Sequence, residues 1–121
     1  MGKFVIRTTK SGGFSFVLKA GNGEVVGVSE TYNSKAACKN GVESVIKNCL
    51  AKVEDTTKDE QVTNPKFEIY KDKKEEFRFR LKAANGEIIL ASEGYATKDG
   101  CKKGIGAVGR AATDAEIIEE E

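Results

Sequence analysis

The chain carries nearly the same stretch of sequence twice. LKAGNGEVVGVSETY runs from Leu18 to Tyr32, and LKAANGEIILASEGY runs from Leu81 to Tyr95. With Lys3 placed over Lys66, the two halves align without a gap at an offset of 63, and 20 of the 53 columns from 3 to 55 are identical. A match of that extent indicates an internal duplication. It predicts repeat one at 3–55 and repeat two at 66–121, joined by a polar linker at 56–65.

Each repeat has the pattern of three strands, a helix and a fourth strand. KFVIRT and KFEIYK, and then FSFVLKA and FRFRLKA, alternate apolar and polar residues as half-buried strands do. Asn-Gly follows, and we expect a type I′ turn because both residues tolerate positive φ. Ser34 and Thr97 are suitable N-caps for helices whose apolar stripes include Cys38 and Cys101. The predicted unit is therefore β-β-β-α-β.

One such unit, at about 55 residues, would bury too little apolar surface to be a stable domain by itself. Two units that share a sheet enlarge a common core. We therefore expect a single domain over residues 1–121, of the α+β class, with one mainly antiparallel sheet and both helices on one of its faces.

The composition argues against most catalytic chemistry. The chain has no histidine, which removes Ser-His-Asp and Cys-His catalysis and histidine metal sites. Its three cysteines, Cys38, Cys49 and Cys101, include no CxxC pair, so we expect buried thiols rather than a disulfide framework or zinc site. We expect no cofactor and no metal.

No apolar run approaches the roughly 20 residues that a membrane helix needs, so we expect no membrane association. The first residues, MGKFVIRTTK, lack the apolar stretch of a signal peptide. A cytoplasmic protein is the expectation.

SEGYATKDGCKKGI, the preceding FRFRLKAANGE and the tandem layout closely resemble the YegP-like bacterial proteins. The resemblance covers nearly the whole chain. It implies two β-β-β-α-β repeats, or a dimer of single repeats, in one sheet with exchanged C-terminal strands. The strands at 52–54 and 116–118 would each cross to the other repeat's part of the sheet. The family is a domain of unknown function, so the resemblance implies no catalytic residue.

Two repeated or glycine-rich motifs have structural as well as functional interpretations. Gly104–Gly109 fits GxGxxG, but it aligns with the middle of the first helix rather than with a strand-to-helix turn, so we expect a packed helix. Side chains that recur at the strand-to-helix junction either form a small ligand pocket or fix the start of the helix. They are Ser29, Glu30, Tyr32 and Lys35, with Ser92, Glu93, Tyr95 and Lys98.

Charge is unevenly distributed. Residues 3–55 carry +3, residues 66–113 carry +4, and the tail 114–121 carries −5. The tail, DAEIIEEE, is either a solvated end or an edge strand protected by charge. A further hypothesis is that it competes with an anionic ligand for the basic face of the sheet.

The sheet face away from the helices is the main candidate for function. The turn register predicts that Ile89 and Ala91 share this face with Arg80 and Lys82. Basic side chains interleaved with aliphatic ones suit a partner protein or a nucleic-acid backbone, unless the other repeat, a second chain or the tail covers the face. The candidate residues are Arg7, Val17, Lys19, Tyr70, Arg78, Arg80, Lys82 and Ile89.

We interpret the chain as a small non-enzymatic binding or structural module that acts through this face on an unidentified protein partner. Nucleic-acid binding is the alternative, although a single tyrosine and a pI near 7.6 weigh against it. An enzyme is the third hypothesis. The internal duplication predicts a monomer and leaves a dimer open.

Overall fold

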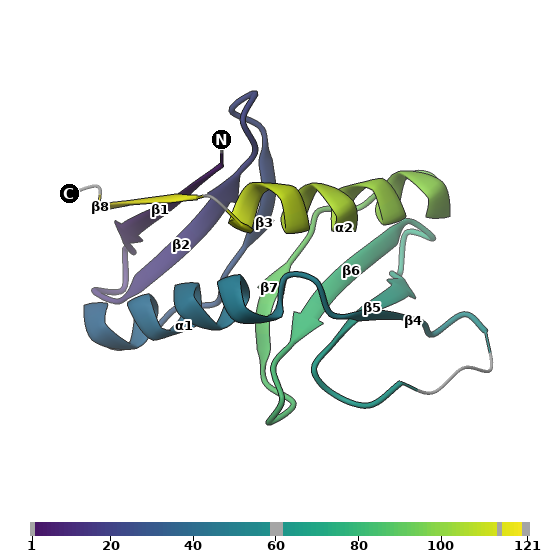
Figure 1. Cartoon of the computed structure of the whole chain (residues 1–121), viewed down its shortest axis with the longest axis horizontal. Helices are drawn as coiled ribbons and strands as arrows, with labels where there is room; N and C mark the ends of the chain where they lie inside the picture. The colour runs from purple at the N-terminus through teal and green to yellow at the C-terminus, as the bar shows by residue number, and fades with distance from the viewer. Residues whose placement is uncertain (1, 59–61, 114, 120–121) are drawn as a thin grey trace.

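Eight strands form one continuous sheet, and two helices pack against one of its faces (Figure 1). The computed structural model describes residues 2–58, 62–113 and 115–119. The strand order across the sheet is β4-β5-β6-β7-β3-β2-β1-β8. If each strand is replaced by its counterpart in the other repeat, the same order results, read from the opposite edge. The elements are β1 (Lys3–Thr8), β2 (Phe14–Lys19), β3 (Val25–Val28), α1 (Lys35–Asn48), β4 (Lys52–Asp55), β5 (Lys66–Lys71), β6 (Phe77–Lys82), β7 (Ile88–Ala91), α2 (Lys98–Thr113) and β8 (Glu116–Glu119).

The last strand of each repeat belongs to the other repeat's half of the sheet. β4 runs parallel to β5, with Lys52 opposite Lys66, and β8 runs parallel to β1, with Glu116 opposite Lys3. All other paired strands are antiparallel, and β3 meets β7 at the centre. The exchange implied by the family resemblance is therefore confirmed. The predicted mainly antiparallel sheet, with both helices on one face, is confirmed too.

Aromatic residues that recur in both repeats fill the space between the sheet and the helices. The Phe16 ring packs edge-on against Phe4, with centroids 5.7 Å apart, and stacks on Tyr32 at 6.3 Å. The same arrangement recurs in repeat two, at 5.8 and 6.3 Å, among Phe67, Phe79 and Tyr95. Such edge-to-face and stacked pairs add to the free energy gained by burying the rings. Each repeat thus supplies one half of a shared core.

The helices begin and approach the sheet as the sequence predicts. Ser34 Oγ accepts a hydrogen bond from the Ala37 amide at 3.1 Å, and this is the predicted N-cap. Gly41 lies against the Tyr32 hydroxyl, where a Cβ atom would clash. The repeat-two counterparts behave in the same way, with Thr97 accepting from the Gly100 amide at 3.0 Å and Gly104 against the Tyr95 hydroxyl. Glycine at these two positions lets the helix lie close to the sheet.

The Asn-Gly turns are not the predicted type I′ turns. Gly23 and Gly86 have φ of +86° and +87°, whereas Asn22 and Asn85 do not have positive φ. In each turn the glycine amide donates to the alanine carbonyl three residues earlier. This is a type I turn followed by a left-handed glycine, the pattern of a three-residue hairpin loop with a bulge. The prediction of positive φ at the asparagine was wrong. The asparagine side chain accepts a hydrogen bond from the amide of the glutamate two residues later, and this bond does not require positive φ.

The bulge changes the register that the sequence predicts. Leu81 is opposite Leu90 as expected, but the pairing shifts at the next residue, so that Lys82 lies opposite Ile88. Ile89 is then only 5% exposed and belongs to the buried core cluster. Ile88, rather than Ile89, is the accessible isoleucine of this strand.

The gapless alignment of the repeats ends before the exchanged strands. β4 begins at Lys52 and β8 at Glu116, an offset of 64, because α2 has 16 residues and α1 has 14, while the connection that follows α2 is one residue shorter. Asp55 therefore corresponds to Glu119 rather than to Ile118, its partner in the gapless alignment.

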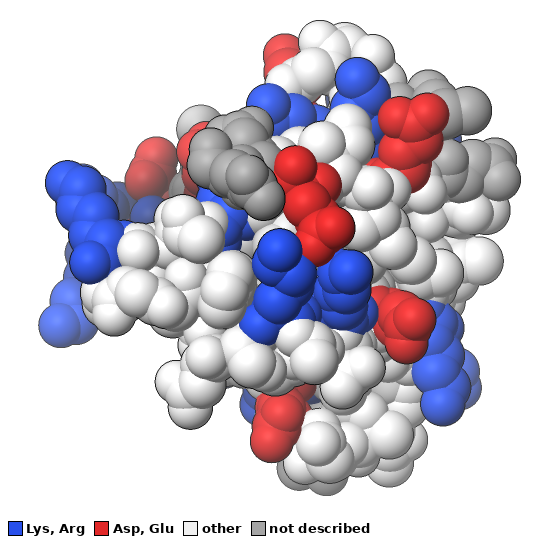
Figure 2. All heavy atoms as spheres, turned by 90° about the vertical axis from the view of Figure 1, so that its left-hand side faces the viewer, with Lys and Arg blue, Asp and Glu red and all other residues white. Residues whose placement is uncertain are grey.

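This corrected correspondence reveals a repeated ion pair. The helix of each repeat begins with a lysine that binds the strand arriving from the other repeat. Lys98 Nζ lies 2.8 Å from Asp55 Oδ2, and Lys35 Nζ lies 3.2 Å from Glu119 Oε1. Within the tail, Glu116–Glu119 thus forms a charged edge strand, and residues 114 and 120–121 lie outside the described residues. Viewed from the side of β8, acidic and basic groups lie beside one another at the centre of the face, and further basic groups gather at the left edge of the view (Figure 2).

The first hairpin of each repeat also turns through a left-handed residue. In repeat one this residue is Gly12, with φ of +86°, and in repeat two it is Glu75, with φ of +66°. Each donates its amide to the carbonyl three residues earlier, at 3.0 Å. Among the described residues, Glu75 is the only non-glycine residue with positive φ. This conformation is costly for a side chain with a Cβ atom.

We therefore expect Glu75→Gly to raise the free energy of unfolding by about 0.5–1 kcal/mol, since relief of the left-handed backbone outweighs the added freedom of the unfolded chain. Urea unfolding measures the change. The reciprocal substitution, Gly12→Glu, should lower stability by about 1 kcal/mol. A Glu75→Gly protein that is no more stable than the wild type would show that this turn carries no strain.

Acid should weaken the contact between β4 and α2. Burial would raise the pKa of Asp55, but hydrogen bonds from Lys98 and Thr57 outweigh it and hold this pKa at about 2, below the ordinary 3.8. A carboxylate whose pKa is depressed in the folded state stabilises the fold above its ordinary pKa and loses that contribution as the pH falls toward 2. We expect Asp55→Asn to be less stable than the wild type at pH 7, with the difference shrinking between pH 5 and about 2.

Denaturant unfolding at several pH values tests this expectation, and Glu119→Gln is the matched control. Glu119 is 41% exposed and Asp55 only 6%, so water screens the first ion pair more and its removal should cost less. A stability difference for Asp55→Asn that is constant with pH would contradict the assignment.

Candidate binding face of the sheet

One residue from every strand lies in a single row across the helix-free face. The row follows directly from the cross-strand register, and it changes from apolar to charged between β7 and β6. From β8 to β7 it is apolar throughout. We call this part the valine row, and it consists of Ile118, Val5, Val17, Val28 and Ala91. The row then continues through Arg80, Glu68 and Glu54.

The valine row is accessible at several points. Val28 is 41% exposed and Ile118 is 36% exposed, while Val17 and Ala91 are partly exposed. Val5 is only 4% exposed, and with Ile118 it lines a hollow of about 300 Å³. Helices cover only the opposite face of the sheet, and β8 joins the edge of the sheet rather than crossing this face (Figure 1). Within the described residues, this face is therefore open.

On the repeat-two side the same face carries a charged cluster, which we define as Glu54, Lys66, Glu68, Arg80 and Lys82. Glu68 is its centre. The Glu68 Oε1 atom lies 2.7 Å from Arg80 Nε and 3.3 Å from Lys82 Nζ, and its Oε2 atom lies 3.3 Å from Lys66 Nζ. Lys66 also contacts Glu54 at 3.1 Å.

The environment of Glu68 keeps it ionised. Its side chain is only 7% exposed. Burial would raise the pKa of Glu68, but hydrogen bonds from Arg80, Lys82 and Lys66 outweigh it and hold this pKa at about 2. A buried carboxylate is stable only with such partners. The cluster is therefore a structural element in which each charge depends on the others.

Two of the basic candidate residues of repeat two also interact with acidic or aromatic side chains outside this cluster. Arg78 Nε lies 2.6 Å from Asp72 Oδ2, and this hydrogen bond lowers the pKa of Asp72. The Arg80 guanidinium lies over the Tyr70 ring, 4.6 Å from its centroid. Arg78, Arg80 and Lys82, which the sequence offers as contacts for a polyanion, thus all bind carboxylates within the chain. A phosphate would have to compete with these carboxylates.

The structure brings together on one face all the predicted residues except Ile89. Arg7 pairs with Ser15 across β1 and β2, and Lys19 pairs with Lys3 beside the valine row. Ile88 takes the predicted place of Ile89 and lines a hollow of about 150 Å³ with Tyr70 and Arg80. Alternation within each strand already predicts Val5 and Val28 on this face, but not that they form one row with Ile118, because the place of Ile118 depends on the pairing of β8 with the other repeat's β1.

The residues that recur at the strand-to-helix junction fix the chain there. Ser29 Oγ accepts from the Phe16 amide at 2.8 Å and donates to the Glu30 carbonyl, and Ser92 makes the equivalent bonds with Phe79 and Glu93. A hollow of about 150 Å³ lies beside Glu93 and Tyr95, against β3. Hydrogen bonds, ring packing and ion pairs within the chain thus account for the two serines, the two tyrosines and the two lysines of this set.

The glycine motif and the cysteines take the structural roles that we expected. Gly104–Gly109 lies inside α2, so no strand-to-helix turn is available to hold a dinucleotide phosphate. All three cysteines are buried and unbridged, and burial raises the pKa of the Cys101 thiol to about 11. In the part of the chain that the structure describes, no cluster of His, Cys, Asp or Glu could hold a metal ion, and no helix is long and apolar enough to cross a membrane.

Tandem β-β-β-α-β repeats in one sheet, with exchanged edge strands, define the class of protein. Comparison with known proteins agrees: the family model described as Domain of unknown function (DUF1508) matches residues 9–55 and again residues 72–119. The chain belongs to this family.

Relatives with both repeats are similar along their whole length. A UPF0339 protein encoded in the ptx operon 5′ region of Stutzerimonas stutzeri is 36% identical over 118 residues, which are 98% of this chain and 96% of that protein. The solution structure of the Escherichia coli protein of unknown function yegP matches with a TM-score of 0.80 at 33% identity, over 98% of this chain and 92% of that one.

A UPF0339 protein from Treponema denticola is 57% identical over 54 residues, which are 45% of this chain but 93% of that protein. Its length is therefore that of a single repeat. The family thus includes chains with one repeat and chains with two.

Breaking the charged cluster should cost more than replacing it. Glu68→Val leaves three cations facing one another, so we expect a loss of about 2 kcal/mol or more in the free energy of unfolding. Glu68→Val with Arg80→Val recreates the Val5–Val17 pair of repeat one, and we expect the double variant to regain at least about 1 kcal/mol of that loss. Urea unfolding of the two single variants and the double variant gives the coupling energy. Strictly additive losses would contradict a mutually dependent cluster.

Proposed function

We propose that the chain is a non-enzymatic protein-binding module whose contact surface is the valine row. One observation carries the proposal. The row continues through five strands as apolar side chains, whereas the corresponding row of repeat two consists of charges that satisfy one another. A sheet face left to solvent normally carries polar residues. An accessible apolar row on such a face is typical of an interaction surface.

The surroundings of the valine row indicate the kind of partner. Lys3 and Lys19 lie opposite each other in the neighbouring row, and within the described residues neither forms an ion pair. The partner that complements this arrangement has apolar side chains at the centre of its contact surface and carboxylates at its rim. Such an arrangement of apolar core and charged rim is common in interfaces that form and separate.

A matched pair of variants tests the proposal. Val28→Glu places a charge in the middle of the valine row, and Ile46→Glu places one at a comparably exposed apolar residue of α1, on the helix side. Purified wild-type and variant proteins are used to capture partners from a bacterial extract, and each captured partner is then titrated against all three by calorimetry. We expect Val28→Glu to weaken binding at least roughly tenfold and Ile46→Glu to leave it unchanged.

Equal affinities for the two variants would contradict the proposed surface. Nucleic acid is tested in parallel by fluorescence anisotropy with single- and double-stranded oligonucleotides at two salt concentrations. Strongly salt-dependent binding that is lost in Arg78→Gln would favour the nucleic-acid alternative over a protein partner.

A further inference from the structure

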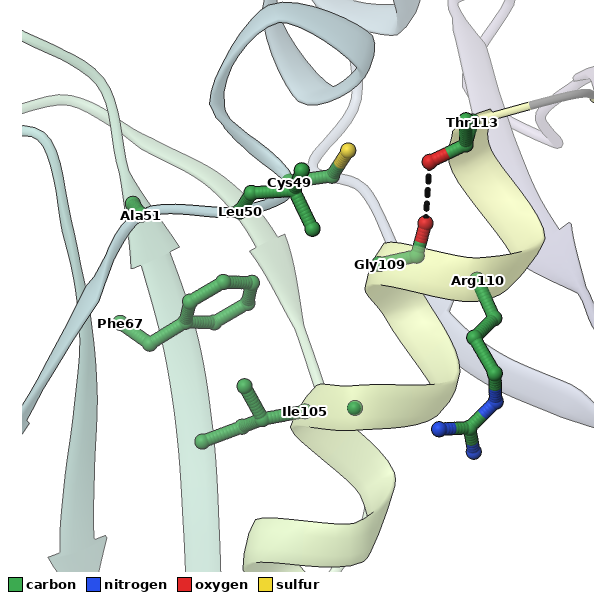
Figure 3. A pocket seen from close by; sticks show the side chains of 9 residues that line it. Cys49, Leu50, Ala51, Phe67, Ile105, Gly109, Arg110 and Thr113 are labelled. Carbon is green, nitrogen blue, oxygen red and sulfur yellow. Dashed lines mark hydrogen bonds between the residues drawn. The ribbon is translucent and has the colours of Figure 1, made fainter.

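A further hollow lies on the helix side of the sheet, where the end of α1 passes the second half of α2 (Figure 3). Its volume is about 370 Å³. Leu50 lies on one side of it, and Phe67 and Ile105 lie across from Leu50. We call it the Leu50 pocket. Its lining is completed by Cys49, Ala51, Gly106, Gly109, Arg110 and Thr113.

The Leu50 pocket exists because the two helices differ at two positions that face it. Gly106 and Gly109 of α2 correspond to Glu43 and Ile46 of α1, at the offset of 63 that holds within the helices. A Cβ atom on Gly109 would lie 3.0 Å from Leu50 Cδ2, so a side chain as large as isoleucine would occupy the hollow. Glycine inside a helix lowers stability by about 1 kcal/mol relative to alanine. Helix α2 carries two such glycines, Gly106 and Gly109, and both line the Leu50 pocket.

The lining combines apolar walls with one cation. Leu50 is 81% exposed, which is unusual for a large apolar side chain that borders a hollow. Arg110 lines the pocket too, with its guanidinium close to Gly106, and it is the only charged residue among the described residues of the lining. Thr113 Oγ1 donates its hydrogen bond to the Gly109 carbonyl at 2.6 Å, and the Cys49 thiol donates to Ile46. Arg110 is thus the donor available to a bound molecule.

We infer that the Leu50 pocket binds a small carboxylate that has an apolar body. The body, an aromatic ring or a short alkyl chain, lies among Leu50, Ile105 and the bare backbone of Gly109. The carboxylate accepts hydrogen bonds from the Arg110 guanidinium, whose planar fork matches it. An enclosed cavity of about 150 Å³ lined by aliphatic and aromatic groups holds benzene, and the Leu50 pocket differs in being open to solvent on one side. The pocket of about 370 Å³ has room for a substituted ring.

This site is separate from the valine row, which lies on the opposite face of the sheet, so either proposal can fail alone. The probes are phenylacetate and hexanoate, with 2-phenylethanol as the uncharged analogue of the first. Methyl NMR spectra of the full chain follow Leu50 and Ile105 during each titration. We expect saturable shifts of both methyl groups with the two carboxylates, and binding of 2-phenylethanol that is weaker by at least about fivefold.

Two variants assign the contacts. Arg110→Gln should weaken phenylacetate binding at least about fivefold, while Lys47→Gln, at the corresponding position of α1, should leave it unchanged. Gly109→Ile should abolish binding. Gly109→Ala is a smaller change in the same wall that should weaken binding, and it serves as the test if the isoleucine variant does not fold.

Three results would overturn the inference. The first is the absence of saturable shifts at Leu50 and Ile105 with either carboxylate. The second is equal affinity in Arg110→Gln and Lys47→Gln, and the third is equal binding of the charged and uncharged probes.

Discussion

The pairing of each repeat's last strand with the other repeat's first strand is the contact on which the rest of the structure depends. Without β4 and β8, the strands β5 and β1 would be open edges with unpaired backbone groups. To reach those places, the chain leaves α1 and α2 near the centre of the molecule and crosses to the opposite half (Figure 1). As a result, α1 contacts β2 and β7, and α2 contacts β6, β3 and β2. Both helices therefore hold the two halves together, and neither repeat encloses a core by itself.

The sequence predicts the elements well because their patterns are local. Alternation identifies the strands, and Ser34 and Thr97 mark the helix starts through hydrogen bonds within one turn. The features that the sequence does not predict depend on the exact number of residues in a helix, a loop or a bulge, which sets the register of distant segments. The recurrence of the Lys98–Asp55 pair as Lys35–Glu119 was hidden because no periodic pattern shows where α2 ends, and the gapless comparison placed Asp55 over Ile118 rather than over Glu119. In β7, one bulge moved Ile89 from the predicted face into the core.

The sequence predicts which residues lie on the candidate face, but not how their side chains pair with one another. Its basic residues are where the alternation puts them, yet their charges are balanced by Glu68 and Asp72. That balance follows from the register between β5 and β6, in which Glu68 lies opposite Arg80. Repeat one fills the same pair of positions with Val5 and Val17. The two halves thus stabilise one geometry by different means, an apolar contact in one and a network of charges in the other.

Joining two repeats in one chain allows substitutions in one repeat without the same substitutions in the other. A dimer of identical single repeats is symmetric, so every substitution appears at two places and must be tolerated at both. The Treponema denticola relative, with the length of one repeat, is bound by that rule in any such dimer. Here each half varies alone, so α2 can lose the side chains that α1 keeps, and one half of the face can be apolar while the other is charged. The fusion converts a symmetric scaffold into one with two unlike halves, at no cost to the strand exchange that holds it together.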